Sequence, residues 1–112
     1  MQESRSVKAA IYNRIGTFYE EFALEDRRVE LEKYSRDALG IDDLEVFDEV
    51  GIFDREVDRP AYRELMRRIR QQEFTHLVVW DWDSLFHDCD DLNRLLQELN
   101  DHGIILVGKA EE

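Results

Sequence analysis

Short apolar runs alternate with segments of helical periodicity along the chain, and this alternation restricts the possible folds more than any other feature of the sequence. The runs with the length of a strand are 7–12, 44–50, 76–82 and 104–107. The segments in which apolar residues recur at helical spacing are 18–39, 60–72 and 90–100. Strands that alternate with helices are typical of a parallel sheet, because parallel neighbours need long crossover connections. We therefore predict a single α/β domain, with a four-stranded, mainly parallel sheet between helices on both faces.

The handedness of the connections limits the order of the strands. Right-handed crossovers favour the order 2-1-3-4, numbered along the chain. In such sheets ligands bind at the carboxyl ends of the strands, near the point between strands 1 and 3 where the order reverses. The turns at 13–17 and 81–88 are therefore the places to look for a site. Pro60 suits the first residue of the second helix, and Gly40 and Gly103 suit the ends of the first and third.

Acidic residues outnumber basic ones by 27 to 15, which gives a net charge of −12. A domain that binds nucleic acid through its own surface usually carries a basic footprint, so we expect direct DNA binding to be weak or absent. The scarcity of lysine is similar to the composition of halophile proteins, although a plain acidic surface explains it too.

Cys89 is the only cysteine, and no apolar run is long enough for a membrane span. We expect a cytoplasmic protein without membrane contact.

Four segments together resemble one known family. They are 10–17 (AIYNRIGT), 48–52 with 58–60 (DEVGI and DRP), 74–88 (FTHLVVWDWDSLFHD) and 91–104. In this order they are similar to the catalytic domain of the serine recombinases, the resolvase/invertase family. The resemblance covers nearly the whole chain and implies the resolvase-like fold. It also implies that the family's dimerisation helix and DNA-binding domain are absent from these 112 residues.

The resemblance also identifies the positions of the family's catalytic site. They correspond to Arg14, Gly16, Thr17, Arg59, Asp83, Ser84 and His87. In the family, a serine hydroxyl attacks a DNA phosphate and forms a phosphoserine link, while arginines hold the phosphate oxygens. Here the serine position holds Gly16, which has no side chain, and two arginine positions hold Ser84 and His87.

These substitutions predict a catalytically inactive, degenerate member of the family that needs no cofactor. Arg14, Arg59 and Asp83 would keep family residues of the site, without a nucleophile between them. Such a chain would act as a binding or regulatory remnant. Its partner would be another recombinase or a second copy of itself.

Two alternatives remain open at this point. In the first, Thr17 or Ser84 supplies a substitute hydroxyl and the domain cleaves DNA. In the second, Asp81 and Asp83 share one face of the third strand and bind Mg²⁺, which would make a metal-dependent phosphotransfer domain or nuclease. This aspartate pair resembles that of the Toprim-type domains. The main prediction assigns no metal site.

Three further patterns have ordinary structural explanations. The buried stripe of the third helix is predicted to consist of Leu92, Leu95, Leu96 and Leu99. Trp80 and Trp82 are expected on one side of the third strand, where they would pack in the core or an interface. Arg63, Arg67 and Arg70 form a basic stripe on the second helix. We expect a solvated face paired with Glu64 and other acidic neighbours, with contact to phosphate or an acidic partner as the alternative.

Overall fold

The structure is a computed structural model, which describes residues 6–15, 21–50, 59–82, 85 and 89–111. Its strands are β1 (Ala9–Ile15), β2 (Leu44–Val50), β3 (His76–Val79) and β4 (Ile105–Gly108). Its helices are α1 (Glu21–Asp37), α2 (Pro60–Arg70) and α3 (Cys89–Asp101), followed by the short 3-10 helix η4 (Lys109–Glu111). Within the described ranges, no helix combines the length and apolar character that a membrane crossing requires.

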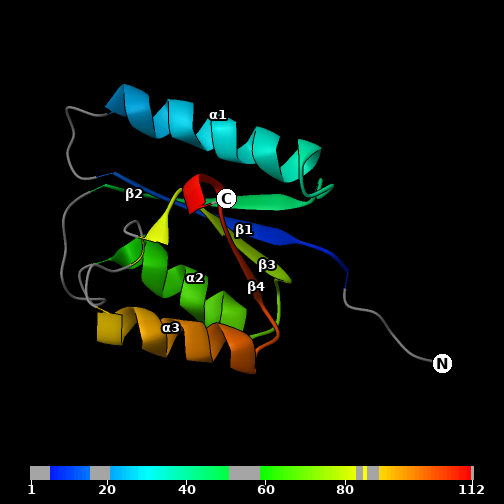
Figure 1. Cartoon of the computed structure of the whole chain (residues 1–112), viewed down its shortest axis with the longest axis vertical. Helices are drawn as coiled ribbons and strands as arrows, with labels where there is room; N and C mark the ends of the chain where they lie inside the picture. The colour runs from blue at the N-terminus through cyan, green and yellow to red at the C-terminus, as the bar shows by residue number, and fades with distance from the viewer. Residues whose placement is uncertain (1–5, 16–20, 51–58, 83–84, 86–88, 112) are drawn as a thin grey trace.

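The four strands form one sheet in the order β2-β1-β3-β4, and every neighbouring pair is parallel. Figure 1 shows α1 on one face of this sheet and α2 with α3 on the other. The predicted α/β fold, strand order and three-layer arrangement are therefore confirmed. The predicted helix boundaries are confirmed at Pro60, which opens α2, and at Gly40 and Gly103, where φ is +68° and +67°. Glycine adopts this left-handed conformation without steric cost.

The central strand β1 is covered on both faces, and all seven of its residues are buried. Successive side chains of a strand point to opposite faces, so β1 contributes to two cores. Ala9 and Ile11 pack with Leu31 of α1, whereas Ala10 and Tyr12 belong to the core under α2 and α3. This second core contains residues from both helices: Tyr62, Leu65, Met66, Ile69, Leu95 and Leu99. Burial on both sides explains why β1 has so few polar residues before Asn13.

The prediction of a polar turn that begins at Asn13 is wrong for residues 13–15, because β1 continues to Ile15. The strand tolerates Asn13 because its amide nitrogen donates to the Leu24 carbonyl at 2.8 Å and to Asp48 Oδ1 at 3.1 Å. These two bonds satisfy the amide nitrogen, whereas the buried Oδ1 of Asn13 has no hydrogen-bond partner among the described residues and carries a desolvation cost. Residues 16 and 17 of the predicted turn lie outside the described residues.

β3 is shorter than predicted, since it ends at Val79. Strand alternation therefore stops before the two tryptophans, and the prediction that they share one side is wrong. Trp80 packs against the α1 core and Trp82 against the core under α2 and α3. The Trp82 ring lies over β4, where a Cβ added to Gly108 would be 2.8 Å from Trp82 Cζ3. Both rings nevertheless pack against the cores, as expected.

The stripe predicted for α3 is correct for Leu95 and Leu99, which are buried, and for Leu92, which packs against them. It is wrong for Leu96, which is 40% exposed. Leu95 and Leu99 lie four positions apart on the face that meets the sheet. Leu96 is rotated about 100° from Leu95 around the helix and therefore points towards solvent.

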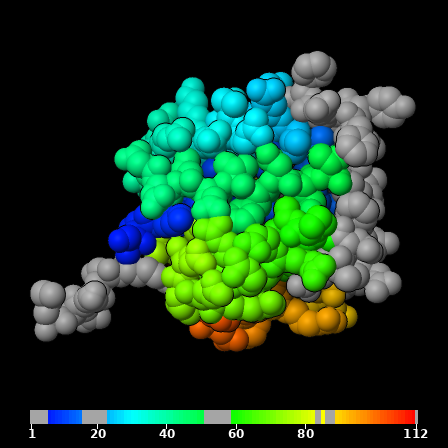
Figure 2. All heavy atoms as spheres, turned by 180° about the vertical axis from the view of Figure 1, so that it is seen from behind, coloured from blue at the N-terminus to red at the C-terminus, as the bar shows by residue number. Residues whose placement is uncertain are grey.

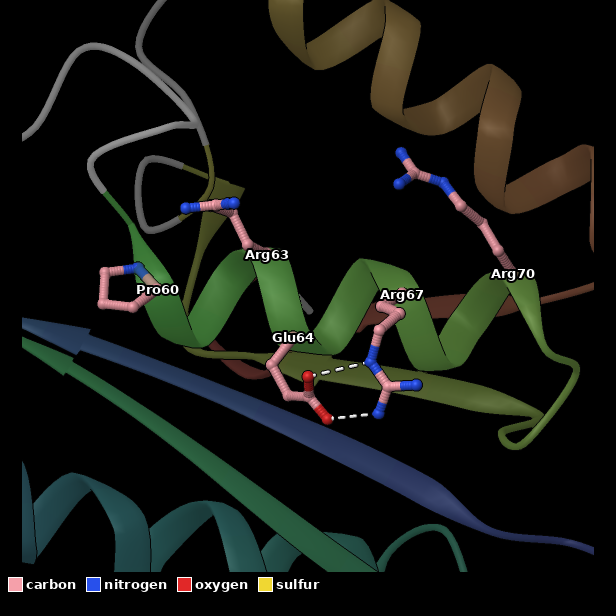
Figure 3. Close-up of a pocket in the computed structure, with 5 residues that line it drawn as sticks. All are labelled: Pro60, Arg63, Glu64, Arg67 and Arg70. Carbon is pink, nitrogen blue, oxygen red and sulfur yellow. Dashed lines mark hydrogen bonds and ion pairs between the residues drawn. The ribbon is translucent and has the colours of Figure 1, made fainter.

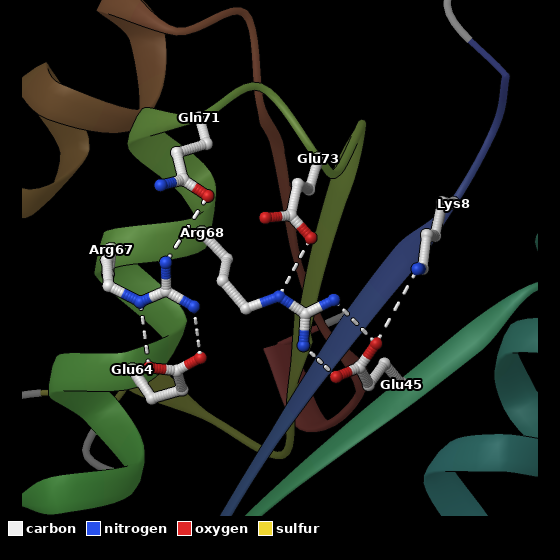
Figure 4. Close-up of polar contacts among 7 residues, drawn as sticks. All are labelled: Lys8, Glu45, Glu64, Arg67, Arg68, Gln71 and Glu73. Atoms are coloured by element: carbon white, nitrogen blue, oxygen red, sulfur yellow. Dashed lines mark hydrogen bonds and ion pairs between the residues drawn. The ribbon is translucent and has the colours of Figure 1, made fainter.

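A group of ion pairs joins the end of α2 to the amino-terminal part of the sheet (Figure 4). Arg68 binds both carboxylate oxygens of Glu45 on β2 and donates from Nε to Glu73 at 2.8 Å. Its guanidinium also lies 5.1 Å from the centre of the Phe74 ring and 5.6 Å from that of Phe47. The Arg68 side chain is only 15% exposed, so these contacts are partly shielded from water.

Candidate functional site

Two buried arginines mark the carboxyl end of the sheet. Arg14 is the penultimate residue of β1, and Arg59 directly precedes α2. Arg14 is 8% exposed and Arg59 1%, which is unusual for a residue type that is seldom buried without a partner. The strand register places Arg14 opposite Glu49 of β2. The site is therefore built where β1, β2 and the start of α2 meet.

Glu49 connects these elements through its carboxylate, which is 4% exposed. Its Oε1 accepts hydrogen bonds from the Tyr12 hydroxyl at 2.8 Å and from the backbone N–H of Tyr62 at 3.0 Å. Its Oε2 accepts from the backbone N–H of Ala61 at 2.9 Å. The first N–H groups of a helix need acceptors, and Arg59 at the N-cap provides no side-chain cap. A glutamate from a neighbouring strand thus caps α2 and places a negative charge at the positive end of its dipole.

Burial and mutual repulsion govern the electrostatics of the arginine pair. Burial lowers the pKa of Arg14, and the charge of Arg59 lowers it further. The negative charges of Glu49 and Asp81 favour the charged form of Arg14 and oppose that shift. Burial, followed by the charge of Glu49, raises the pKa of Tyr12 well above its usual value. Tyr12 is therefore a neutral hydrogen-bond donor to Glu49 at any ordinary pH.

Arg59 also contacts the segment that follows β3. Its Nη1 donates a hydrogen bond to the backbone carbonyl of Leu85, a residue that is fully buried. Arg59 thereby ties the start of α2 to the turn that was expected to carry site residues. Asp81 lies just after β3 and is half-buried.

The chemistry available to this arrangement is the binding of an anion. A guanidinium is planar, stays charged and matches two oxygens of a phosphate or carboxylate at once. Two such guanidinium groups would favour a single oxyanion that both of them bind. In the described part of the chain, no three His, Cys, Asp or Glu side chains converge as a metal site would require.

Two of the site residues predicted from the sequence, Arg14 and Arg59, lie within the described residues, and they are near enough for the charge of Arg59 to lower the pKa of Arg14. The other five lie outside the described residues: Gly16, Thr17, Asp83, Ser84 and His87. The metal alternative placed Asp81 and Asp83 on one strand face. That reasoning does not apply, because β3 ends at Val79 before either residue.

Sequence reasoning missed Tyr12 and Glu49 as members of this site. A signal for Glu49 was present, because it shares the alternation of 44–50 with Phe47. A carboxylate on the same strand face as a large aromatic residue indicates a buried acid, and a buried acid needs donors. The signal did not identify the donors, since they come from α2 and β1.

Comparisons with known proteins agree on the kind of domain. The family model described as "Resolvase, N terminal domain" matches residues 9–112. The search of curated protein sequences gave no significant match.

Among solved structures, the N-terminal catalytic domain of TP901-1 integrase superposes with a TM-score of 0.79 at 24% identity, over 93% of this chain and 78% of that one. A serine recombinase from Sulfolobus solfataricus gives 0.73 at 22% identity, over 93% and 69%. A resolvase family site-specific recombinase from Streptococcus pneumoniae gives 0.75 at 16% identity, over 95% and 74%. At these identities the structural likeness supports the fold.

Proposed function

The chain belongs to the resolvase N-terminal domain family, whose members are related to site-specific DNA recombination, and we propose that this member does not catalyse strand cleavage. The observation that carries the proposal is Gly16, the residue that the family resemblance aligns with the nucleophilic serine. Glycine has no hydroxyl, and covalent catalysis at this position requires one. Ser84 and His87 at two arginine positions weaken the expected site further, because they provide less stabilisation of phosphate charge.

The proposed role is binding. Its support is that Arg14 and Arg59 are both buried and influence each other electrostatically, while Glu49 caps the start of α2. Arginines without a nucleophile would hold an anion without reacting with it. With a net charge of −12, the domain would gain little from DNA itself, so a protein partner is favoured: another recombinase or a second copy of the chain.

The test is incubation with supercoiled plasmid, with and without Mg²⁺, followed by denaturing electrophoresis for nicks and covalent protein–DNA links. We expect neither product. A covalent link that disappears in Thr17→Ala or in Ser84→Ala would refute the proposal and identify a substitute nucleophile. Nicking that requires Mg²⁺ and leaves no covalent link would instead support the carboxylate alternative, and Asp81→Asn and Asp83→Asn would then abolish it.

A further inference from the structure

Helix α2 differs in charge from the rest of the chain. It contains four arginines and one glutamate, a surplus of three positive charges, in a chain whose net charge is −12. Its neighbour α3 has four acidic residues and one arginine, a surplus of three negative charges. In Figure 2 the outer side of α2 is an open green surface between the teal of β2 and the orange of α3. A local cationic surface on such an acidic chain calls for an explanation.

Three of the four arginines line a hollow of about 430 Å³ on this outer side. We call it the α2 groove; its lining residues are Pro60, Arg63, Glu64, Arg67 and Arg70. The fourth arginine, Arg68, takes part in the ion pairs beneath the helix and does not line the groove. At a rise of about 1.5 Å per residue, Arg63 and Arg67 stand about 6 Å apart along the axis, and Arg70 lies about 4.5 Å further.

Two of the three groove arginines, Arg67 and Arg70, already bind a carboxylate with two donors each. Arg67 donates to the two oxygens of Glu64 at 2.9 and 2.6 Å (Figure 3). Arg70 donates to the two oxygens of Glu98 on α3 at 2.5 and 3.1 Å. This confirms the predicted ion-paired face for these two residues. The pairs are exposed, so an incoming carboxylate can replace them at small cost. Arg63 makes no ion pair with any residue that the structure describes.

We infer that the α2 groove binds an acidic segment of a partner protein, with carboxylates spaced about one helical turn apart. Such a segment matches the spacing of Arg63 and Arg67, because residues four apart on a helix lie on one face. It brings only a few negative charges, and these meet the groove rather than the acidic surface around it. Neither Arg14 nor Arg59 lines the groove, so the inference does not depend on whether the domain cleaves DNA.

Nucleic acid fits the groove less well than an acidic protein segment. Duplex DNA carries a negative charge about every 1.7 Å, so a bound duplex would extend many charges past the three arginines. Outside α2 the remaining residues carry a net charge of −15, which is −12 less the +3 of the helix. The repulsion from those residues would outweigh three exposed contacts.

The test uses fluorescence anisotropy with three labelled probes. The first is an alanine-based helical peptide with glutamate at every fourth position, the second has glutamine at those positions, and the third is a short DNA duplex. We expect only the glutamate peptide to bind, and to bind more weakly as salt rises from about 0.1 M to 1 M and shortens the screening length. The double variant Arg63→Gln/Arg67→Gln should weaken this binding about tenfold.

The matched control is Arg94→Gln, which removes an exposed arginine on α3 that pairs with Asp91 three positions earlier, at 3.5 Å. It should leave peptide binding unchanged, and melting curves of both variants check that they fold. Equal binding by the double variant and the wild type would overturn the inference, as would absence of binding to the wild type. Tighter, arginine-dependent binding of the duplex would overturn it in favour of a phosphate surface. The plasmid assay addresses the proposed lack of catalysis separately.

Discussion

Replacing Arg68 with alanine should destabilise the fold far more than the same change one residue earlier. The Arg68 side chain has two carboxylate partners, Glu45 and Glu73, and lies against two aromatic rings. Each ion pair is partly shielded and contributes up to about 1 kcal/mol. The aromatic contacts add about 0.5–1 kcal/mol. The expected loss in free energy of unfolding is therefore about 2–3 kcal/mol.

This loss converts into a change that calorimetry measures easily. Unfolding entropy of about 2.1 cal/mol/K per residue gives about 0.24 kcal/mol/K for a chain of this length. Arg68→Ala should accordingly lower Tm by about 8–12 °C. The control is Arg67→Ala, on the same helix, which removes a 55% exposed side chain whose partners, Glu64 and Gln71, are both within four positions. Its Tm should hardly change, because exposed pairs of this kind contribute little.

A third variant separates charge from geometry. Arg68→Lys keeps the positive charge but cannot bind both oxygens of Glu45 while it donates to Glu73. Its Tm should lie between those of the wild type and Arg68→Ala. The reasoning is wrong if Arg68→Ala and Arg67→Ala lower Tm equally, since shielding would then have no effect on the strength of these contacts.

Three further predictions concern the core and the candidate site. Tyr12→Phe should cost about 1 kcal/mol at neutral pH. Burial raises the pKa of Tyr12, so the stability that Tyr12 contributes is fully present below the unfolded value of about 10 and is lost as pH rises beyond it. Above that pH, the free energy of unfolding measured in urea should therefore fall less steeply with pH in Tyr12→Phe than in the wild type. Parallel curves of free energy against pH would contradict this reasoning. Glu49→Gln should cost about 2–4 kcal/mol in chemical denaturation, because it leaves the buried Arg14 with less compensating charge; an unchanged midpoint would exclude this role. Gly108→Ala should cost about 1–3 kcal/mol and alter tryptophan fluorescence, because the new Cβ would meet the Trp82 ring; an unchanged spectrum and Tm would mean that the ring moves aside freely.

The sheet and its layers were predictable because their signal is periodic. The apolar run of β1, the alternation in β2 and the leucines of α3 each reflect one local pattern of burial. The strand ends were less predictable, because they depend on contacts between distant residues. Asn13 stays within β1 only because Leu24 and Asp48 accept its amide hydrogens.

The candidate site also has one part that the sequence identified and one part that depends on contacts between distant residues. Arg14 and Arg59 were found through a family resemblance, which compares positions and needs no geometry. The connection that Glu49 makes between Tyr12 and the first turn of α2 was not found, since its partners lie 37 and 12–13 positions away. Local periodicity carries no information about pairs at such separations.

The central position of β1 also has a consequence for how the chain acquires its structure during synthesis. Ala9 pairs with Leu44 and with His76, which follow it by 35 and 67 positions. At a translation rate of about 5–20 residues per second, β1 waits several seconds for its second neighbour. Closing such long loops also slows folding, because their entropy is lost before the strand contacts form. The first strand to be made thus keeps an unpaired edge until β3 has been synthesised, and in that interval this edge favours aggregation.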